Sequence, residues 1–433
     1  MVIDDARPEK LVSSKIRTAL IGGAAVALAL LVGLQIYASA EGFTGPLHSL
    51  ASDYVATPKS ASVPWAALAL ALVGLNNRRR LVVFGLAAGI DAVFLIERLI
   101  RGGAVTVGNG PTIVLTGLVL VAAFRWWGIE RRTALHAAAL GWLLILATKV
   151  GDAWLQITAL SRPVVLDQYA ELADRALGNP SWYLGRAIDW LGPVVYNVLH
   201  WVYIELPVAA MVVAVWQLRH VVRDRVWPKH YLVRTFLVLG LVGPIIYVFF
   251  PVVGPIFAYQ DFWPNVVPAV DVTPTGLPFD DFTPRNCMPS MHTAWALTVF
   301  IHSRQGPRWL RWGGTFWLVC TLTATLGFGY HYGVDLVAGA VLCLTVESAL
   351  RDPERGWGLW RIRLVVGGAV ALLGLLASYR FLAVQMAEYR ELFGLLVLGT
   401  LALMAVAFHR TFFRESRVPP TPVDGGGGSL VRS

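Results

Sequence analysis

Residues Thr283–Leu297 read TPRNCMPSMHTAWAL and join a polar segment to an apolar one. An arginine, a proline, a serine and a histidine stand in front of a run that predicts a membrane helix over residues 288–305. Titratable side chains at membrane depth are costly and usually functional. His292, at the start of this run, is therefore a candidate functional residue.

The composition of the whole chain is that of a membrane protein. Of its 433 residues, 56% are hydrophobic and 15% are charged, which is too apolar for an ordinary soluble domain. A helix needs about 20 mostly apolar residues to cross a bilayer. We therefore predict an all-α integral membrane protein with about twelve transmembrane helices. Their approximate limits are 17–40, 60–76, 81–100, 110–127, 134–153, 191–217, 231–250, 288–305, 309–328, 331–350, 361–380 and 390–409.

Most of the 36 lysines and arginines fall in alternate loops, such as NNRRR at residues 76–80 and RHVVRDRVWPKHYLVR at residues 219–234. Because basic residues concentrate in cytoplasmic loops, this alternation predicts a multi-pass plasma-membrane protein with both termini cytoplasmic. The formal net charge of +9 then reflects topology. Basic residues spread over many loops form no continuous surface for a nucleic acid.

The chain divides into four predicted parts. Residues 1–155 form a five-helix region of unknown role, and its first span is longer than a signal peptide and is expected to be retained. Residues 156–350 form a six-helix core, residues 351–410 two further helices, and residues 411–433 a flexible cytoplasmic tail rich in Gly and Pro. The three cysteines, two of them inside spans, suggest no disulfide framework.

Two long segments lie on the predicted outer side. Residues 160–190 carry apolar side chains at spacings of three and four with charges between them, which predicts an amphipathic helix at the membrane interface. These apolar residues are Val165, Leu166, Tyr169, Leu172, Ala173, Ala176 and Leu177. Residues 251–287 are rich in Pro, Asp and aromatics and lead into the His292 segment. Loops of this length are usually functional.

A second histidine stands at a matching depth. His331 opens the span 331–350 and lies 39 residues after His292, which is about enough for one helix down and one back. Both imidazoles are therefore expected at the same outer face. Asp335 follows His331 by four residues, so its carboxylate is expected on the same helical face, where it can fix the tautomer of the ring.

This set of residues suits phosphoryl transfer. An oriented His331 can attack phosphorus while His292 protonates the departing alkoxide. The start of the His292 helix offers free amides and the Ser290 hydroxyl to a phosphate, and Arg285 offers a planar cation. Each residue also has a plainer interpretation: Ser290 as a helix cap, Arg285 as an interfacial cation, and Tyr332, our third candidate substrate contact, as part of an aromatic belt.

The segments PRNCMPSMHTAWAL and YHYGVDLVAG resemble the type 2 phosphatidic acid phosphatase superfamily, in particular the branch of inositol phosphorylceramide synthases and their bacterial relatives. The resemblance covers about residues 164–350. It implies His331 as nucleophile, Asp335 as its partner and His292 as general acid, acting on lipid phosphate esters or diphosphates without metal or other cofactor. The basic motifs of the superfamily are not recognisable, since Ile256 and Thr325 stand where an arginine and a serine are common.

Two questions stay open in the sequence. The first is whether water or a lipid hydroxyl receives the phosphoryl group, which separates a lipid phosphatase from a headgroup phosphotransferase. The second is whether the chain is instead a polytopic transporter, a lipid flippase or an inactive scaffold. Ionisable residues inside the N-terminal spans allow a polar route there, or they form ion pairs such as Lys149–Asp91 or Lys149–Asp152. The lipid substrate and the oligomeric state are not determined by the sequence.

Overall fold

The computed structural model describes residues 7–103, 105–269 and 273–414, and most of these residues are helical. The strands among them are two residues long: β1 (Val164–Val165) pairs antiparallel with β2 (Leu277–Pro278). The predicted all-α class is therefore confirmed at this level. Most of the predicted tail, from residue 415 onward, lies outside the described residues.

The N-terminal helices are α1 (Arg7–Ala40), α2 (Pro46–Val55), α3 (Ser62–Leu72), α4 (Asn77–Ile100), α5 (Asn109–Arg125) and α6 (Gly128–Ser161). The middle of the chain forms α7 (Asp167–Asp174), η1 (Arg175–Leu177), α8 (Pro180–Leu191), α9 (Pro193–Ile204), α10 (Leu206–Leu218), α11 (Val221–Asp224), α12 (Leu232–Phe249) and α13 (Pro255–Ala258). It continues with α14 (Met291–Ser303), α15 (Arg308–Gly327), α16 (Gly333–Leu350) and η2 (Pro353–Arg355), and ends with α17 (Leu359–Phe381), α18 (Ala383–Glu388), α19 (Arg390–His409) and η3 (Arg410–Arg414).

Six of the described helical segments are long and apolar enough to cross a membrane: α6, α10 with α11, α12, α16, α17 and α19 with its extension. The predicted count of about twelve is not confirmed. All twelve predicted segments do contain helix, but α3 has 11 residues, α14 has 13, and α4 begins with three arginines. The predicted span 191–217 is interrupted because Pro207, in the first turn of α10, has no N–H to continue α9.

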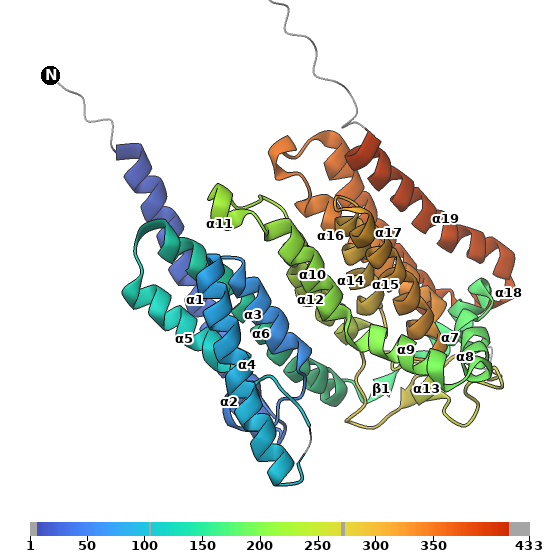
Figure 1. Ribbon diagram of the computed structural model, residues 1–433. Coiled ribbons are helices and arrows are strands. Elements are labelled where there is room, and N and C mark those ends of the chain that lie inside the picture. Colours follow the sequence, from blue (N-terminus) through green and yellow to red (C-terminus); the bar gives the residue numbers. More distant parts are fainter. Residues whose placement is uncertain (1–6, 104, 270–272, 415–433) are drawn as a thin grey trace, which may run out of the picture.

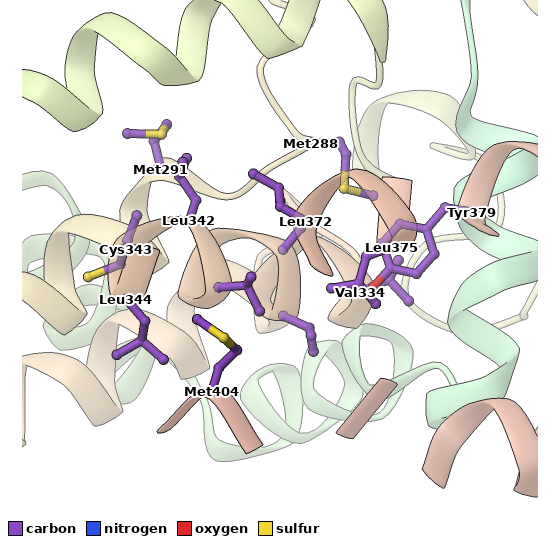
Figure 2. Close-up of a cluster of buried hydrophobic side chains, with 14 of the residues drawn as sticks. Met288, Met291, Val334, Leu342, Cys343, Leu344, Leu372, Leu375, Tyr379 and Met404 are labelled. Carbon is purple, nitrogen blue, oxygen red and sulfur yellow. The ribbon is translucent and has the colours of Figure 1, made fainter. Parts of the chain in front are cut away.

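Helix α16 is the centre of the fold. In its most apolar window 89% of the residues are buried inside the protein, against 22–39% in the other five spanning segments. Figure 2 shows its side chains Leu342, Cys343 and Leu344 packed with residues of other elements, among them Met291 and Met404. A helix that is covered on all sides is apolar all round, which explains why the sequence of α16 has no polar face.

The two ends of the molecule differ in what they contain. Helices α7, α8 and α13 and strand β1 lie together at one end (Figure 1). The start of α1, the short helix α11 and the end of α19 lie at the opposite end. The described beginning and end of the chain therefore face the same side, in the arrangement that an even number of crossings requires.

The N-terminal helices pack directly on the middle of the chain. Leu70 of α3, Val73 directly after it and Leu140 of α6 share one buried cluster with residues of α10, α12 and α14. The indole N–H of Trp154 in α6 also donates to the carbonyl of Pro244 in α12 at 2.8 Å. The two parts of the chain thus form one continuous packed unit.

The predicted partners of Lys149 were wrong. Its ammonium pairs with Asp53 of α2 at 2.6 Å, and both side chains are buried. Asp91 instead accepts hydrogen bonds from the backbone N–H groups of Gly108 and Gly110 and from an indole N–H. The sequence did not predict α2, so it offered no means of finding Asp53.

Candidate active site at the start of two neighbouring helices

The first turns of α14 and α16 lie side by side. The N–H of Ser290 donates to the carbonyl of Asp335 at 3.1 Å. A Cβ placed on Gly339 would lie 2.2 Å from the carbonyl oxygen of Ser290, so this approach of the two helices requires glycine. The contact brings the His292 segment and the His331 segment to the same place, as their spacing suggests.

His331 and Asp335 face each other at the start of α16. His331 precedes the helix by two residues, and its Nδ1 lies 3.4 Å from Oδ2 of Asp335. The same carboxylate oxygen accepts the backbone N–H of Tyr332 at 2.8 Å and so caps the helix. The sequence placed both residues inside the helix. In the structure Asp335 is the third residue of α16, and its carboxylate points back toward His331, which lies outside the helix.

Cys287 is a further member of the site, which the sequence analysis did not identify. Its thiol donates to Oδ2 of Asp335 at 2.6 Å, and both side chains are fully buried. Burial, with the carboxylate beside it, raises the pKa of the Cys287 thiol well above its usual range. The thiol therefore stays protonated and acts as a donor that holds the carboxylate.

His292 is held by Tyr203 of α9. The two rings stack with centroids 3.9 Å apart, and the tyrosine OH lies 3.0 Å from Nδ1 of His292. This contact leaves Nε2 of His292 for a substrate. His292 also lies close enough to His331 for the charges of the two rings to interact. Tyr203 is 89 residues away in the sequence, where no motif marks it.

Arg285 has a different environment from the one we expected. It is fully buried, and its guanidinium donates to backbone carbonyls of Arg162, Thr283, Phe279 and Asp280. These contacts tie the loop before α14 to the end of α6. The predicted contact with a substrate phosphate has no counterpart among them.

The other two predicted substrate contacts are also buried. Ser290 is the N-cap of α14, and its hydroxyl accepts the N–H of Thr293 at 3.3 Å. Tyr332 is fully buried, and its OH donates to Asp167 at 2.9 Å. Both residues are buried and contribute to the packing around the site. A role in substrate binding stays a prediction.

With this geometry in place, the middle of the chain can be compared with known families. Residues 182–348 match the PAP2 superfamily. This match supports the predicted superfamily and suggests phosphatase or phosphotransferase activity. The predicted synthase branch is a finer assignment. Residues 19–157 match a family described as a domain of unknown function, DUF5933. No curated protein and no solved structure matches the chain.

The PAP2 segment is supported by three buried acids of α7, immediately before it. Asp167, Glu171 and Asp174 are all fully buried, although the sequence suggested that the charges of this helix face outward. Asp167 accepts the N–H groups of Val253 and Gly254, and Asp174 accepts that of Val334. The acidic side of α7 thus holds the loop after α12 and the start of α16.

Burial also changes the protonation of these acids. It raises the pKa of Asp167 to about 6 and that of Glu171 to about 7, and it raises the pKa of Asp174 well above its usual range. Hydrogen bonds from the backbone and from Tyr332 act in the opposite direction at Asp167. The face of α7 that touches the PAP2 segment is therefore partly protonated near neutral pH.

Two groups of side chains have the spacing of metal ligands among the described residues: Cys287 with His331 and Asp335, and His230 with His302 and Glu347. In the first group the raised pKa of Cys287 opposes metal binding, since a metal requires the thiolate. Oδ2 of Asp335 already accepts the Cys287 thiol and the backbone N–H of Tyr332. Metal independence stays a prediction.

The second group lies at the far ends of α14 and α16 and is a hydrogen-bonded network. Gln217 accepts the N–H of Leu232 with its oxygen, so its nitrogen donates to Nδ1 of His302, at 2.9 Å. His302 must then carry its proton on Nε2, which faces Glu347 at 3.2 Å. Arg351 neutralises the same carboxylate at 2.9 Å. This network ties four elements together and leaves His302 no free nitrogen for a metal.

Proposed function

We propose that the protein is a membrane lipid phosphatase or lipid headgroup phosphotransferase that acts at the outer leaflet through a phosphohistidine. The observation that carries this proposal is the contact between Nδ1 of His331 and the buried carboxylate of Asp335. A carboxylate on Nδ1 fixes the ring so that Nε2 is free as the nucleophile. His292 stands nearby as the second imidazole that such a reaction needs.

In the first step Nε2 of His331 attacks phosphorus. A P–N bond forms, the P–O bond to the lipid breaks, and the leaving alkoxide takes a proton from His292. Burial lowers the pKa of His292 in the free site, so the ring must take up this proton when the negatively charged phosphate binds beside it. Asp335 stabilises the positive charge that develops on the His331 ring, as an acid does in other nucleophile–histidine pairs. The dipole of α14, whose first turn carries His292, favours a phosphate at the same place.

In the second step an acceptor hydroxyl attacks the phosphohistidine. His292, now neutral, takes the proton of the hydroxyl, the P–O bond forms and the P–N bond breaks. Water as the acceptor yields free phosphate, and a lipid alcohol yields a new phosphodiester or phosphate ester. We favour hydrolysis because it requires no second substrate site. The inositol phosphorylceramide synthase branch is the alternative that requires one.

The first prediction tests this proposal directly. Purified protein in detergent should release phosphate from at least one member of a panel containing phosphatidic acid, a polyprenyl diphosphate and lysophosphatidic acid. His331→Ala should lower this release by at least about a thousandfold, because the nucleophile is lost. An acid-labile, base-stable phosphoenzyme should form in the wild type and not in the variant.

His409→Ala is the matched control, since His409 is exposed at the end of α19. It should leave the rate unchanged. Equal phosphate release by the wild type and His331→Ala would exclude the proposed mechanism. The same assay with an added lipid alcohol would decide between the two forms of the reaction, because a phosphotransferase would give the phosphorylated alcohol rather than free phosphate.

A further inference from the structure

A cavity lined by both polar and apolar side chains lies between the DUF5933 segment and the loop that precedes α14. Its volume is about 740 Å³, within the range of small-molecule sites. The turn after α1, helix α2, the start of α3 and one face of α6 form most of its wall. Phe282 and Pro284, from the loop before α14, complete it. The cavity therefore needs both parts of the chain.

One face of α6 supplies the longest wall of this cavity. Its members lie at spacings of three and four, so they point to the same side over about 16 Å of helix. They are Ile145, Thr148, Lys149, Asp152, Leu155 and Gln156. Hydroxyl, ammonium, carboxylate and amide groups thus line a helix that is otherwise apolar enough to span a membrane. Such a run of polar side chains on a spanning helix indicates a binding site or a pathway.

The charges in the cavity balance. Lys149 pairs with Asp53 at 2.6 Å in its buried part. Lys59 faces Asp152 at 3.8 Å, where the two side chains are 70% and 53% exposed. An anion entering the cavity would meet a carboxylate beside each ammonium, and a cation would meet an ammonium beside each carboxylate. The lining thus gives neither ion a net electrostatic gain.

We propose that this cavity binds a neutral, hydroxyl-rich group, either a free polyol or the sugar-like headgroup of a lipid. Thr44, Ser60 and Gln156 add donors and acceptors to the two ion pairs, and hydroxyl groups can use both kinds. Phe43 and Phe282 also line the cavity, and Phe282 is 81% exposed. Aromatic rings of this kind give a flat apolar surface for the C–H side of a polyol.

The position of the cavity links it to the proposed reaction. Asp280 accepts the N–H groups of Phe282 and Thr283 and so folds the loop that reaches the cavity. Arg285 then ties this loop to the carbonyl of Arg162 after α6. A ligand that touches both α6 and Phe282 therefore holds this loop five residues before Cys287. This link between ligand binding and catalysis rests on the proposed function.

The test measures binding to the full chain in lipid nanodiscs by isothermal titration calorimetry. The probes are myo-inositol, glucose and inorganic phosphate, with nanodiscs containing glucosyl diacylglycerol as the lipid-borne form. Saturable binding of a polyol, free or lipid-borne, is expected, and phosphate should not compete with it. Gln156→Leu should weaken binding by about tenfold, since it removes a hydrogen-bonding group worth about 1.4 kcal/mol. Asp152→Asn should weaken it as well, since a donor replaces one of the two acceptor oxygens and the charge that balances Lys59 is lost.

Glu97→Gln is the matched control for Asp152→Asn, because Glu97 forms an exposed ion pair with Arg101 at 3.0 Å and does not line the cavity. It should bind as the wild type does. The His331→Ala variant should also retain binding, which separates this proposal from the catalytic one. Absence of saturable polyol binding, binding that both cavity variants leave intact, or preferential binding of phosphate would each overturn it.

Discussion

At the scale of single residues, Cys287 offers the sharpest test of how the site is held. Its thiol donates to Oδ2 of Asp335, the same oxygen that faces His331. Cys287→Ala removes one donor to a buried carboxylate, which we expect to lower kcat by about tenfold with little change in KM. Cys287→Ser supplies another donor and should retain most of the activity. Steady-state kinetics on the best lipid substrate checks both values.

Cys320→Ala is the control for this experiment, because Cys320 is half-buried on α15. It should behave as the wild type. Equal losses in Cys287→Ala and Cys287→Ser would mean that the size of the thiol matters rather than its hydrogen bond.

Single residues also show where sequence reasoning ends. His292, His331 and Asp335 could be expected to lie close together because their spacing follows from helix length, and their catalytic roles stay predictions. Tyr203 and Cys287 could not, because their roles depend on which helices become neighbours. Arg285 was assigned to a phosphate on its charge alone, yet its guanidinium meets carbonyls of its own loop. A charge predicts that a side chain needs partners, and the fold decides which partners it has.

At the scale of elements, the approach of α14 to α16 depends on Gly339. Gly339→Ala places a methyl group against the carbonyl of Ser290, so the two helix starts must separate. We expect a loss of phosphatase activity of at least about tenfold, because small displacements at a catalytic site are costly. Gly367→Ala in α17 meets open space and should be neutral or slightly stabilising. Activity and melting temperature, measured together, separate the two variants, and similar behaviour of both would contradict the proposed packing.

Helix α7 gives a second prediction at this scale. The pKa of Glu171 is raised by burial from 4.5 to about 7 in the folded protein. The folded state thus binds the proton more tightly, so this stabilisation is full below about pH 4.5 and is lost as the pH rises through about 7. Melting temperature should fall between pH 5 and pH 8. Glu171→Gln should flatten this fall and raise the melting temperature at pH 8 by about 2–4 °C.

The amide of Glu171→Gln can still accept the indole N–H of Trp182, which Glu171 accepts at 3.2 Å. The expected gain at pH 8 therefore comes from the lost charge alone. A slope with pH that is the same in the wild type and the variant would show that Glu171 does not titrate in this range. The amphipathic pattern was recognised in the sequence, but its acids were expected to face outward because buried acids are rare. In the structure they are buried together with apolar residues such as Leu172 and Ala173.

At the scale of the whole molecule, the sequence indicated the class and the positions of most helices. Apolar length is a local property, and all twelve predicted segments contain helix. The number of crossings could not be predicted from apolar length alone. Helix α14 has only 13 residues and is apolar because other helices enclose it. The contact between the N-terminal helices and α10, α12 and α14 had no signal in the sequence, since apolar faces do not specify their partners.

The ion pair between Lys149 and Asp53 can be used to test how helix α2 is held against helix α6. Both side chains are less than 10% exposed, so Lys149→Met leaves a buried carboxylate without a partner. Removing one member of a buried pair costs about 3–5 kcal/mol, and the melting temperature in detergent should fall accordingly. Lys149→Met combined with Asp53→Asn should recover part of the loss, because no charge is then left unpaired. Arg101→Gln, in an exposed pair, should change the melting temperature little. If the double variant is no more stable than Lys149→Met, the two side chains are not coupled, and α2 is held against α6 by its apolar contacts alone.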